Sequence, residues 1–161
     1  MTDTIKTGGC QCGAVRFRIS GKLGRPSICH CRMCQKQFGG FFSALVTAPE
    51  EAMEWTRGAP KWFQSSDLVR RGFCGDCGTP LFYDIPGTDF INLTLGSLDN
   101  PDTVKPVMQS NTGRKMSWFH ALDGLPIEPQ PETPDRENAI AASNHQHPDH
   151  DTKSWPLGET S

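Results

Sequence analysis

Seven cysteines in three short groups constrain this chain of 161 residues more than any other feature of its sequence. The groups are a C-x-C pair, a C-x-C-x-x-C triplet and a C-x-x-C pair: Cys10 and Cys12, then Cys29, Cys31 and Cys34, then Cys74 and Cys77. Zinc holds its sulfur ligands about 2.3 Å away in a tetrahedron, and short loops bring neighbouring thiolates to one ion at little entropic cost. The spacing therefore favours metal binding.

The expected compartment supports the same interpretation. No apolar run approaches the ~20 residues of a membrane span, and the stretch MTDTIKTGGCQC lacks the apolar segment of a secretory signal. We therefore expect a cytoplasmic protein without a membrane partner. Thiols stay reduced in the cytosol, and an odd number of cysteines cannot complete a set of disulfides. Metal ligands or catalytic thiols are the better expectation.

Counting ligands divides the cysteines between two sites, provided that each local group stays whole. A closed structural zinc site needs about four protein ligands. The two pairs supply four, namely Cys10, Cys12, Cys74 and Cys77. Such a site would close a long loop and stabilise a domain with a small core. The triplet supplies only Cys29, Cys31 and Cys34. Three protein ligands and an open position are typical of a catalytic zinc.

Two other uses of the triplet stay open at this level. His30 would complete a closed Cys3His site, but three adjacent residues do not easily point at one ion. We therefore expect His30 to lie behind the ligands or at the surface. Cys31 and Cys34 also form the C-x-x-C of a thioredoxin-like redox pair, which opens a helix after a strand in an α/β unit. The surrounding sequence gives little sign of such a unit.

The pattern of apolar residues predicts a mainly β domain of short antiparallel strands. Alternating or apolar runs bounded by turn residues predict strands within residues 14–21, 41–49, 61–74 and 80–98. One or two helical turns are expected over RMCQKQFG, with Gly39 as the stop. Sixteen glycines and thirteen prolines agree with many turns. Because only 35% of the residues are hydrophobic, the core is expected to be modest and to need support from metal.

Composition changes near Glu128 and divides the chain into a zinc-binding domain over residues 1–127 and a tail over 128–161. The tail is polar, acidic and rich in proline, so we expect it to be disordered and flexible. Its three histidines, His145, His147 and His150, are not expected to bind metal. The formal charge of −2 gives no general support for a nucleic-acid partner.

Four motifs carry a resemblance to a known family. GGCQCGAVRF, CHCRMCQKQFGG, FCGDCGTPLF and WFHALDGLP resemble the glutathione-dependent formaldehyde-activating (GFA) family, and all seven cysteines fall in the family pattern. The resemblance spans about residues 8–127. It implies a small zinc-bound Mss4-like fold in which two small sheets pack together. It also implies two zinc ions per chain, a structural one at the two pairs and a catalytic one at the triplet.

The resemblance further implies a zinc-dependent carbon-sulfur lyase-type enzyme. It would join a thiol, glutathione, to a small aldehyde such as formaldehyde and give S-hydroxymethylglutathione. Metal coordination generates thiolate from a thiol whose free pKa is near 8.5, and an open zinc position binds a sulfur or polarises an aldehyde oxygen. His30 and His120 are the candidates for proton transfer.

Glutathione carries two carboxylates, so a groove for it needs positive charge. Arg32 and Lys36 lie beside the triplet in the sequence. Four further cations reach it only if the fold brings them close: Arg70, Arg71, Arg114 and Lys115. Surface solvation explains such charges equally well. Three tryptophans are expected to pack the small core: Trp55, Trp62 and Trp118.

Two functions of other classes compete with the enzyme. In one, both metal sites are structural and the domain is a non-catalytic, zinc-stabilised binding module for a protein partner. In the other, the domain carries glutathione or another thiol without turnover. Fold analogy does not separate the three, and the sequence predicts no oligomeric state.

Overall fold

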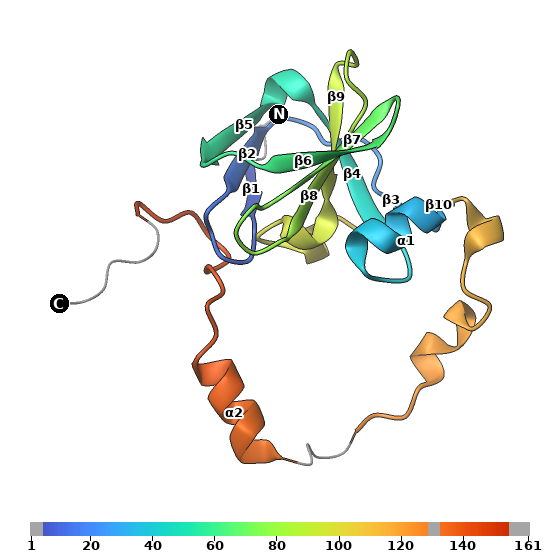
Figure 1. Cartoon of the computed structure of the whole chain (residues 1–161), viewed down its shortest axis with the longest axis vertical. Coiled ribbons are helices and arrows are strands. Elements are labelled where there is room, and N and C mark those ends of the chain that lie inside the picture. Colours follow the sequence, from blue (N-terminus) through green and yellow to red (C-terminus); the bar gives the residue numbers. More distant parts are fainter. Residues whose placement is uncertain (1–4, 129–132, 155–161) are drawn as a thin grey trace.

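The computed structural model describes residues 5–128 and 133–154, and these residues form a mainly β architecture (Figure 1). The strands in these ranges are β1 (Ile5–Gly9), β2 (Arg16–Ser20), β3 (Ser27–Cys29), β4 (Ser43–Pro49), β5 (Met53–Arg57), β6 (Lys61–Ser66), β7 (Val69–Phe73), β8 (Pro80–Asp84), β9 (Phe90–Thr94) and β10 (Met108–Ser110). The helices are α1 (Arg32–Phe38) and α2 (Pro134–Ala142). Neither of them is long and apolar enough to cross a membrane.

The strands form two sheets, as the resemblance implies. A three-stranded sheet has the order β1-β2-β5, and a larger one has the order β10-β3-β4-β9-β8-β7-β6. Neighbouring strands are antiparallel except β10 and β3, which run parallel. The prediction of a mainly β fold with short antiparallel strands is therefore confirmed. The second sheet matters most for the site, because β3 leads into the cysteine triplet and β10, from a distant part of the chain, pairs beside it.

Helix α1 begins and ends where its sequence predicts. Cys31 is the N-cap, with extended backbone and a sulfur that accepts a hydrogen bond from the Cys34 amide. Such a cap satisfies one of the amides that the first helical turn leaves free. Gly39 ends the helix in the left-handed region, at φ 64°, where a side chain would be strained. The helix therefore fixes two cysteines of the triplet relative to each other.

The hydrophobic core lies between the two sheets. Its most buried side chains come from both of them: Phe17, Ile19, Val46, Leu81 and Leu93. Trp55 packs against this core, with its ring 5.9 Å from that of Phe17 in an edge-on arrangement. Trp62 and Trp118 are 53% and 44% exposed, so the expectation that all three tryptophans pack the core is wrong for these two. Trp62 belongs to the edge strand β6, and no other strand of the described residues pairs with its outer side.

The tail adds no core of its own, but part of it returns to the domain. Helix α2 stands apart from the sheets, and none of its residues is buried (Figure 1). Farther along, His147 is only 3% exposed, because residues 146–152 lie against the first sheet. The sequence did not predict this contact. Part of the expected disordered tail, residues 129–132 and 155–161, lies outside the described residues, and the domain boundary near residue 127 stays a prediction.

Candidate metal centres

The fold gathers the seven cysteines into two clusters and divides them as the ligand count does. One cluster contains Cys10, Cys12, Cys74 and Cys77, and the other contains Cys29, Cys31 and Cys34. Within each cluster all sulfurs lie within 4.8 Å of one another, and all seven thiols are free of disulfides. We call them the four-sulfur cluster and the three-sulfur cluster. Their roles, structural and catalytic, stay predictions.

The four-sulfur cluster joins two tight turns. Cys10 and Cys12 follow β1, and Cys74 and Cys77 follow β7. The sulfurs of Cys10 and Cys12 are 3.6 Å apart, and those of Cys12 and Cys74 are 3.8 Å apart. Four sulfurs about 2.3 Å from one ion at tetrahedral angles lie about 3.8 Å from one another. The spacing therefore fits zinc.

Backbone amides stabilise the sulfurs of this cluster. The Val15 amide donates to the Cys10 sulfur at 3.2 Å, and the Asp76 amide donates to the Cys74 sulfur at 3.4 Å. Burial raises the pKa of Cys10 to about 12. Burial also raises the pKa of Cys77, but hydrogen bonds with Thr79 outweigh it and lower that pKa to about 6. A buried thiol such as Cys10 loses its proton readily only beside a cation, which agrees with a metal-binding role.

The three-sulfur cluster lies where β3 passes into α1. Cys29 ends β3, Cys31 caps α1, and Cys34 lies in the first turn of that helix. A helix after a strand is the local setting of a redox C-x-x-C, but the sheet around it is almost wholly antiparallel and forms no α/β unit. Three sulfurs on one short segment fit a zinc with three protein ligands, in which a fourth position is left for another molecule.

Side chains from two distant strands reach these sulfurs. Asn111, directly after β10, donates its amide to the Cys29 sulfur at 3.4 Å. Its backbone is left-handed at φ 53°, a conformation that asparagine tolerates better than most residues. Arg71 of β7 donates from Nη2 to the Cys34 sulfur, also at 3.4 Å. Sequence reasoning missed Asn111. It named Arg71 only as one of four cations that reach the triplet if the fold brings them close.

The pKa values of the Cys34 and Cys29 thiols are shifted in opposite directions. Burial raises the pKa of Cys34 to about 11, against the opposing effects of Ser43 and Arg71. Burial acts in the same direction on Cys29, but the Cys31 backbone and the Ser110 hydroxyl outweigh it and lower the pKa of Cys29. Cys29 is therefore more easily ionised than the buried Cys34, which depends on its neighbours to become a ligand.

His30 is neither a ligand nor a surface residue. It is fully buried, and its Nε2 lies 3.0 Å from the Gln109 side-chain oxygen. The rings of Phe42 and Phe119 meet it edge-on, with centroids 6.1 and 5.1 Å away. The expectation that His30 does not complete a Cys3His site agrees with this geometry, but the suggestion of a surface position is wrong. His120, the other candidate for proton transfer, is exposed.

The remaining predicted cations have different surroundings. Arg70 pairs with Asp84, and Lys115 lies over the Phe119 ring at 5.5 Å. The Arg114 carbonyl accepts a hydrogen bond from the Gln35 side chain, so Arg114 contacts α1 through its backbone. Arg32 and Lys36 are exposed on α1 and line a cavity of about 320 Å³, together with Met33, Gln37, Phe63 and Ser65.

A segment of the tail covers the C-x-C turn of the four-sulfur cluster. We call residues 146–152 the C-terminal strap. The His147 amide donates to the Gln11 carbonyl at 2.7 Å. Gly13 faces the His147 ring at φ 76°, and a methyl group at Gly13 would overlap that ring. The turn between Cys10 and Val15 is therefore enclosed by its own backbone on one side and by the strap on the other.

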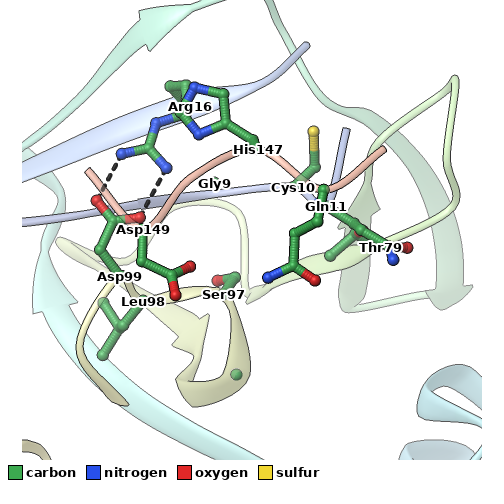
Figure 2. Close-up of a pocket in the computed structure, with 12 residues that line it drawn as sticks. Gly9, Cys10, Gln11, Arg16, Thr79, Ser97, Leu98, Asp99, His147 and Asp149 are labelled. Atoms are coloured by element: carbon green, nitrogen blue, oxygen red, sulfur yellow. Dashed lines mark hydrogen bonds and ion pairs between the residues drawn. The ribbon is translucent and has the colours of Figure 1, made fainter. Parts of the chain in front are cut away.

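Charged groups hold the strap beside this turn. Arg16, itself buried, donates to Asp99 at 2.7 Å and to Asp151 at 2.8 Å. Figure 2 shows its guanidinium directed at Asp99, and it draws His147 and Asp149 of the strap with Gly9 and Cys10 among the residues that line one cavity. A cavity of about 310 Å³ remains between the strap and the domain. Its lining includes Cys10 but no residue of the three-sulfur cluster, so it belongs to the four-sulfur end of the molecule.

Two curated proteins are similar in sequence to part of this chain. A protein of Phaeosphaeria nodorum named "Putative glutathione-dependent formaldehyde-activating enzyme" is 29% identical over 94 residues, which cover 53% of this chain and 50% of the relative. A protein of Schizosaccharomyces pombe named as an uncharacterized lyase is 28% identical over 76 residues, or 47% of this chain and 55% of the relative. The chain thus spans about half the length of these curated relatives.

A solved structure shares the fold. The crystal structure of a Rhodobacter sphaeroides protein superposes with a TM-score of 0.53 at 22% identity, covering 65% of this chain and 99% of that one. The sequence profile of the glutathione-dependent formaldehyde-activating enzymes matches residues 5–114, which include all seven cysteines and more than half of the chain. The chain therefore belongs to the glutathione-dependent formaldehyde-activating (GFA) family.

Proposed function

We propose that the chain is a zinc-dependent carbon-sulfur lyase-type enzyme that joins glutathione to formaldehyde or another small aldehyde. The observation that carries the proposal is the second cluster. Three cysteines gather on one segment without a fourth protein ligand among the described residues, in a chain whose other four cysteines already make a complete set. The family and the names of the relatives support an enzyme of this kind.

The cluster would supply the chemistry only with its metal. A zinc ion held by Cys29, Cys31 and Cys34 would offer Lewis acidity and stabilise a substrate thiolate at neutral pH. In the reaction the thiol sulfur forms a bond to the carbonyl carbon, the thiol proton is lost, and the carbonyl oxygen gains a proton. No electrons enter or leave, so the step needs no redox partner.

The residues around the cluster orient its sulfurs. Asn111 fixes Cys29 through its side-chain amide, and Arg71 fixes Cys34 through its guanidinium. The Cys34 backbone amide, in the first turn of α1, donates to the Cys31 sulfur and fixes it. Groups behind metal ligands commonly tune both the affinity for the metal and the activity. Each of the three ligands thus has its own hydrogen-bond donor.

Arg32 and Lys36 are proposed to bind a carboxylate of glutathione. They are four residues apart on α1, so they lie on the same face of the helix. The cavity that they line also contains Ser65, whose hydroxyl accepts from Arg71, the residue that contacts Cys34. A thiol whose carboxylate sits in this cavity therefore lies near the cluster.

Exchange measured by NMR tests the reaction, because uncatalysed addition of glutathione to formaldehyde is itself fast. We expect the zinc-loaded protein to accelerate exchange between the two reactants and S-hydroxymethylglutathione, and Cys31→Ser to lose that acceleration while staying folded. A protein that binds two zinc ions but does not change the exchange rate would instead be a binding module or a thiol carrier. Arg32→Glu with Lys36→Glu should raise the KM for glutathione and leave kcat largely unchanged.

A further inference from the structure

Arg71 is a buried cation without a carboxylate partner among the described residues. Its side chain is 2% exposed, and none of the ion pairs in the described ranges includes it. Its neighbour Arg70, on the opposite face of β7, pairs with Asp84 in the usual way. An isolated charge is costly inside a protein unless an opposite charge or a full set of hydrogen bonds compensates it. Arg71 therefore needs an anion other than a carboxylate to compensate its charge.

The contacts of Arg71 lead to the three-sulfur cluster. Nη2 donates to the Cys34 sulfur at 3.4 Å, and Nε donates to the Ser65 hydroxyl at 3.0 Å. The guanidinium lies over the Tyr83 ring, 4.9 Å from its centroid. Hydroxyl and ring are neutral, so the sulfur of Cys34 is the one contact in this set that becomes an anion when it binds metal.

Unsatisfied polar atoms gather at the same place. In the described ranges, three buried side-chain atoms make no hydrogen bond of ordinary geometry: His30 Nδ1, Arg71 Nη1 and Ser43 Oγ, although the Ser43 hydroxyl lies close enough to the Cys34 sulfur to lower the pKa of that thiol. His30 lies between Cys29 and Cys31, Ser43 pairs with Cys29 across β3 and β4, and Arg71 contacts Cys34. Buried polar atoms are rarely left unpaired unless a water, an ion or a function accounts for them. All three adjoin the segment that carries the incomplete ligand set.

Charge counting gives Arg71 a specific role. Three thiolates around a dication leave one net negative charge, and on the buried side of the cluster, at Cys34, that charge needs a cation to offset it. We propose that Arg71 is a positioning residue that supplies this counter-charge and thereby determines how tightly the three-sulfur cluster holds zinc. The inference rests on the proposed function only through the metal, because it requires a zinc at this cluster but no particular substrate.

Zinc affinity tests the inference without any measurement of turnover. In the full-length protein we compare Arg71→Met with Arg71→Lys, which differ mainly in charge, and with Arg70→Met as the control on the opposite face. Competition with a chromophoric chelator gives the affinity of each zinc, and cobalt substitution reports thiolate coordination through its charge-transfer band. The three-sulfur cluster, with one protein ligand fewer, is expected to hold the more weakly bound zinc. Arg71→Met should weaken that zinc about 10–100-fold, as is common when a residue behind metal ligands is removed.

The control variants separate charge from packing. Arg71→Lys should hold the weaker zinc at least about tenfold more tightly than Arg71→Met, and Arg70→Met should bind both ions as the parent protein does. Equal affinities in the Lys and Met variants would overturn the inference, and so would loss of the tightly bound zinc or of the fold in Arg71→Met, since either result makes Arg71 a structural residue. An inactive parent protein would refute the proposed reaction but leave this test unchanged.

Discussion

The two clusters differ in where their sulfurs find hydrogen-bond donors. At the four-sulfur cluster the donors include amides of the same turns, those of Val15 and Asp76. At the three-sulfur cluster, Asn111 and Arg71 donate from segments 82 and 37 residues away from the sulfurs that they contact. A short sequence motif therefore builds these donors of the first set. In the second set only the Cys34 amide, which donates to Cys31, is local, and the other two donors reach their sulfurs only in the finished fold. This difference is the one expected between a structural metal site, which stabilises the fold, and a catalytic metal site, whose surroundings the fold assembles.

The largest difference between the clusters is expected in folding. Cys74→Ser removes a buried sulfur from the cluster that joins the β1 turn to the β7 turn, and with it a proposed zinc ligand. Structural zinc contributes on the order of 10 kcal/mol in small domains, comparable with the roughly 5–15 kcal/mol by which domains are stable. We therefore expect this variant to be unfolded by circular dichroism. Cys31→Ser should be folded, with one zinc fewer by elemental analysis. Equal loss of structure in both variants would contradict the proposed division.

The strap provides the next largest effect, confined to the four-sulfur end. A shortened chain that ends at residue 128 loses the Asp151 partner of Arg16 and the His147 contact with Gly13. It should fold and keep both zinc ions, because no cluster ligand lies in the tail. We expect a loss of about 1–3 kcal/mol, typical of a broken buried network, and faster zinc release from the four-sulfur cluster alone. Chemical denaturation and chelator kinetics measure the two effects; faster release from the three-sulfur cluster would show that the strap acts on both.

Acid should reduce the contribution of the strap. Arg57 donates to His147 Nε2 at 3.3 Å, and Nδ1 lies 2.7 Å from the Pro148 carbonyl, which requires the neutral ring with its proton on Nδ1. Burial, with Arg16 and Arg57 nearby, lowers the pKa of His147, although the Pro148 carbonyl and Asp99 oppose this. A lowered pKa in the folded state means that the contribution is complete above the unfolded pKa, about 6.5, and is lost as the pH falls through the lowered value.

The shortened chain supplies the control for this pH dependence. The difference in melting temperature between the full and shortened chains should be constant above pH 7 and should shrink as the pH falls below about 6.5. Zinc loss at low pH affects both chains, so the difference isolates the strap. The same shrinkage in His147→Gln, which does not titrate, would assign the effect to other groups, such as Asp151.

The sequence predicted what local spacing determines and missed what register and topology determine. The short helix ending at Gly39 and the strands within residues 61–74 follow from nearby residues, and the cysteine division follows from counting ligands in local groups. In VRRGF, alternation places Arg70 and Arg71 on opposite faces, but only the pairing of β7 with β6 and β8 decides which is buried. Asn111 reaches Cys29 because β10 pairs with β3 at the edge of the sheet, and no local sequence pattern predicts that pairing.

His147 was hidden for a different reason. Its neighbours in the sequence are polar, so composition indicated a disordered segment. Its burial depends on Gly13, whose missing side chain leaves room for the ring, and on Arg16, whose charge matches Asp151. Complementarity between two segments more than 130 residues apart cannot be derived from either one alone.

The smallest expected difference concerns Asn111. Asn111→Gly keeps the left-handed backbone at low cost but removes the amide that donates to Cys29. One such hydrogen bond contributes about 0.5–1.5 kcal/mol, so zinc at the three-sulfur cluster should bind roughly 2–10-fold more weakly in chelator competition. The four-sulfur cluster should be unaffected. Asn111→Ala, which loses the amide and also strains the backbone, should weaken the same zinc further and lower the melting temperature slightly. If the glycine variant binds zinc like the parent while the alanine variant does not, Asn111 acts through its backbone, and side-chain donation at this cluster rests on Arg71.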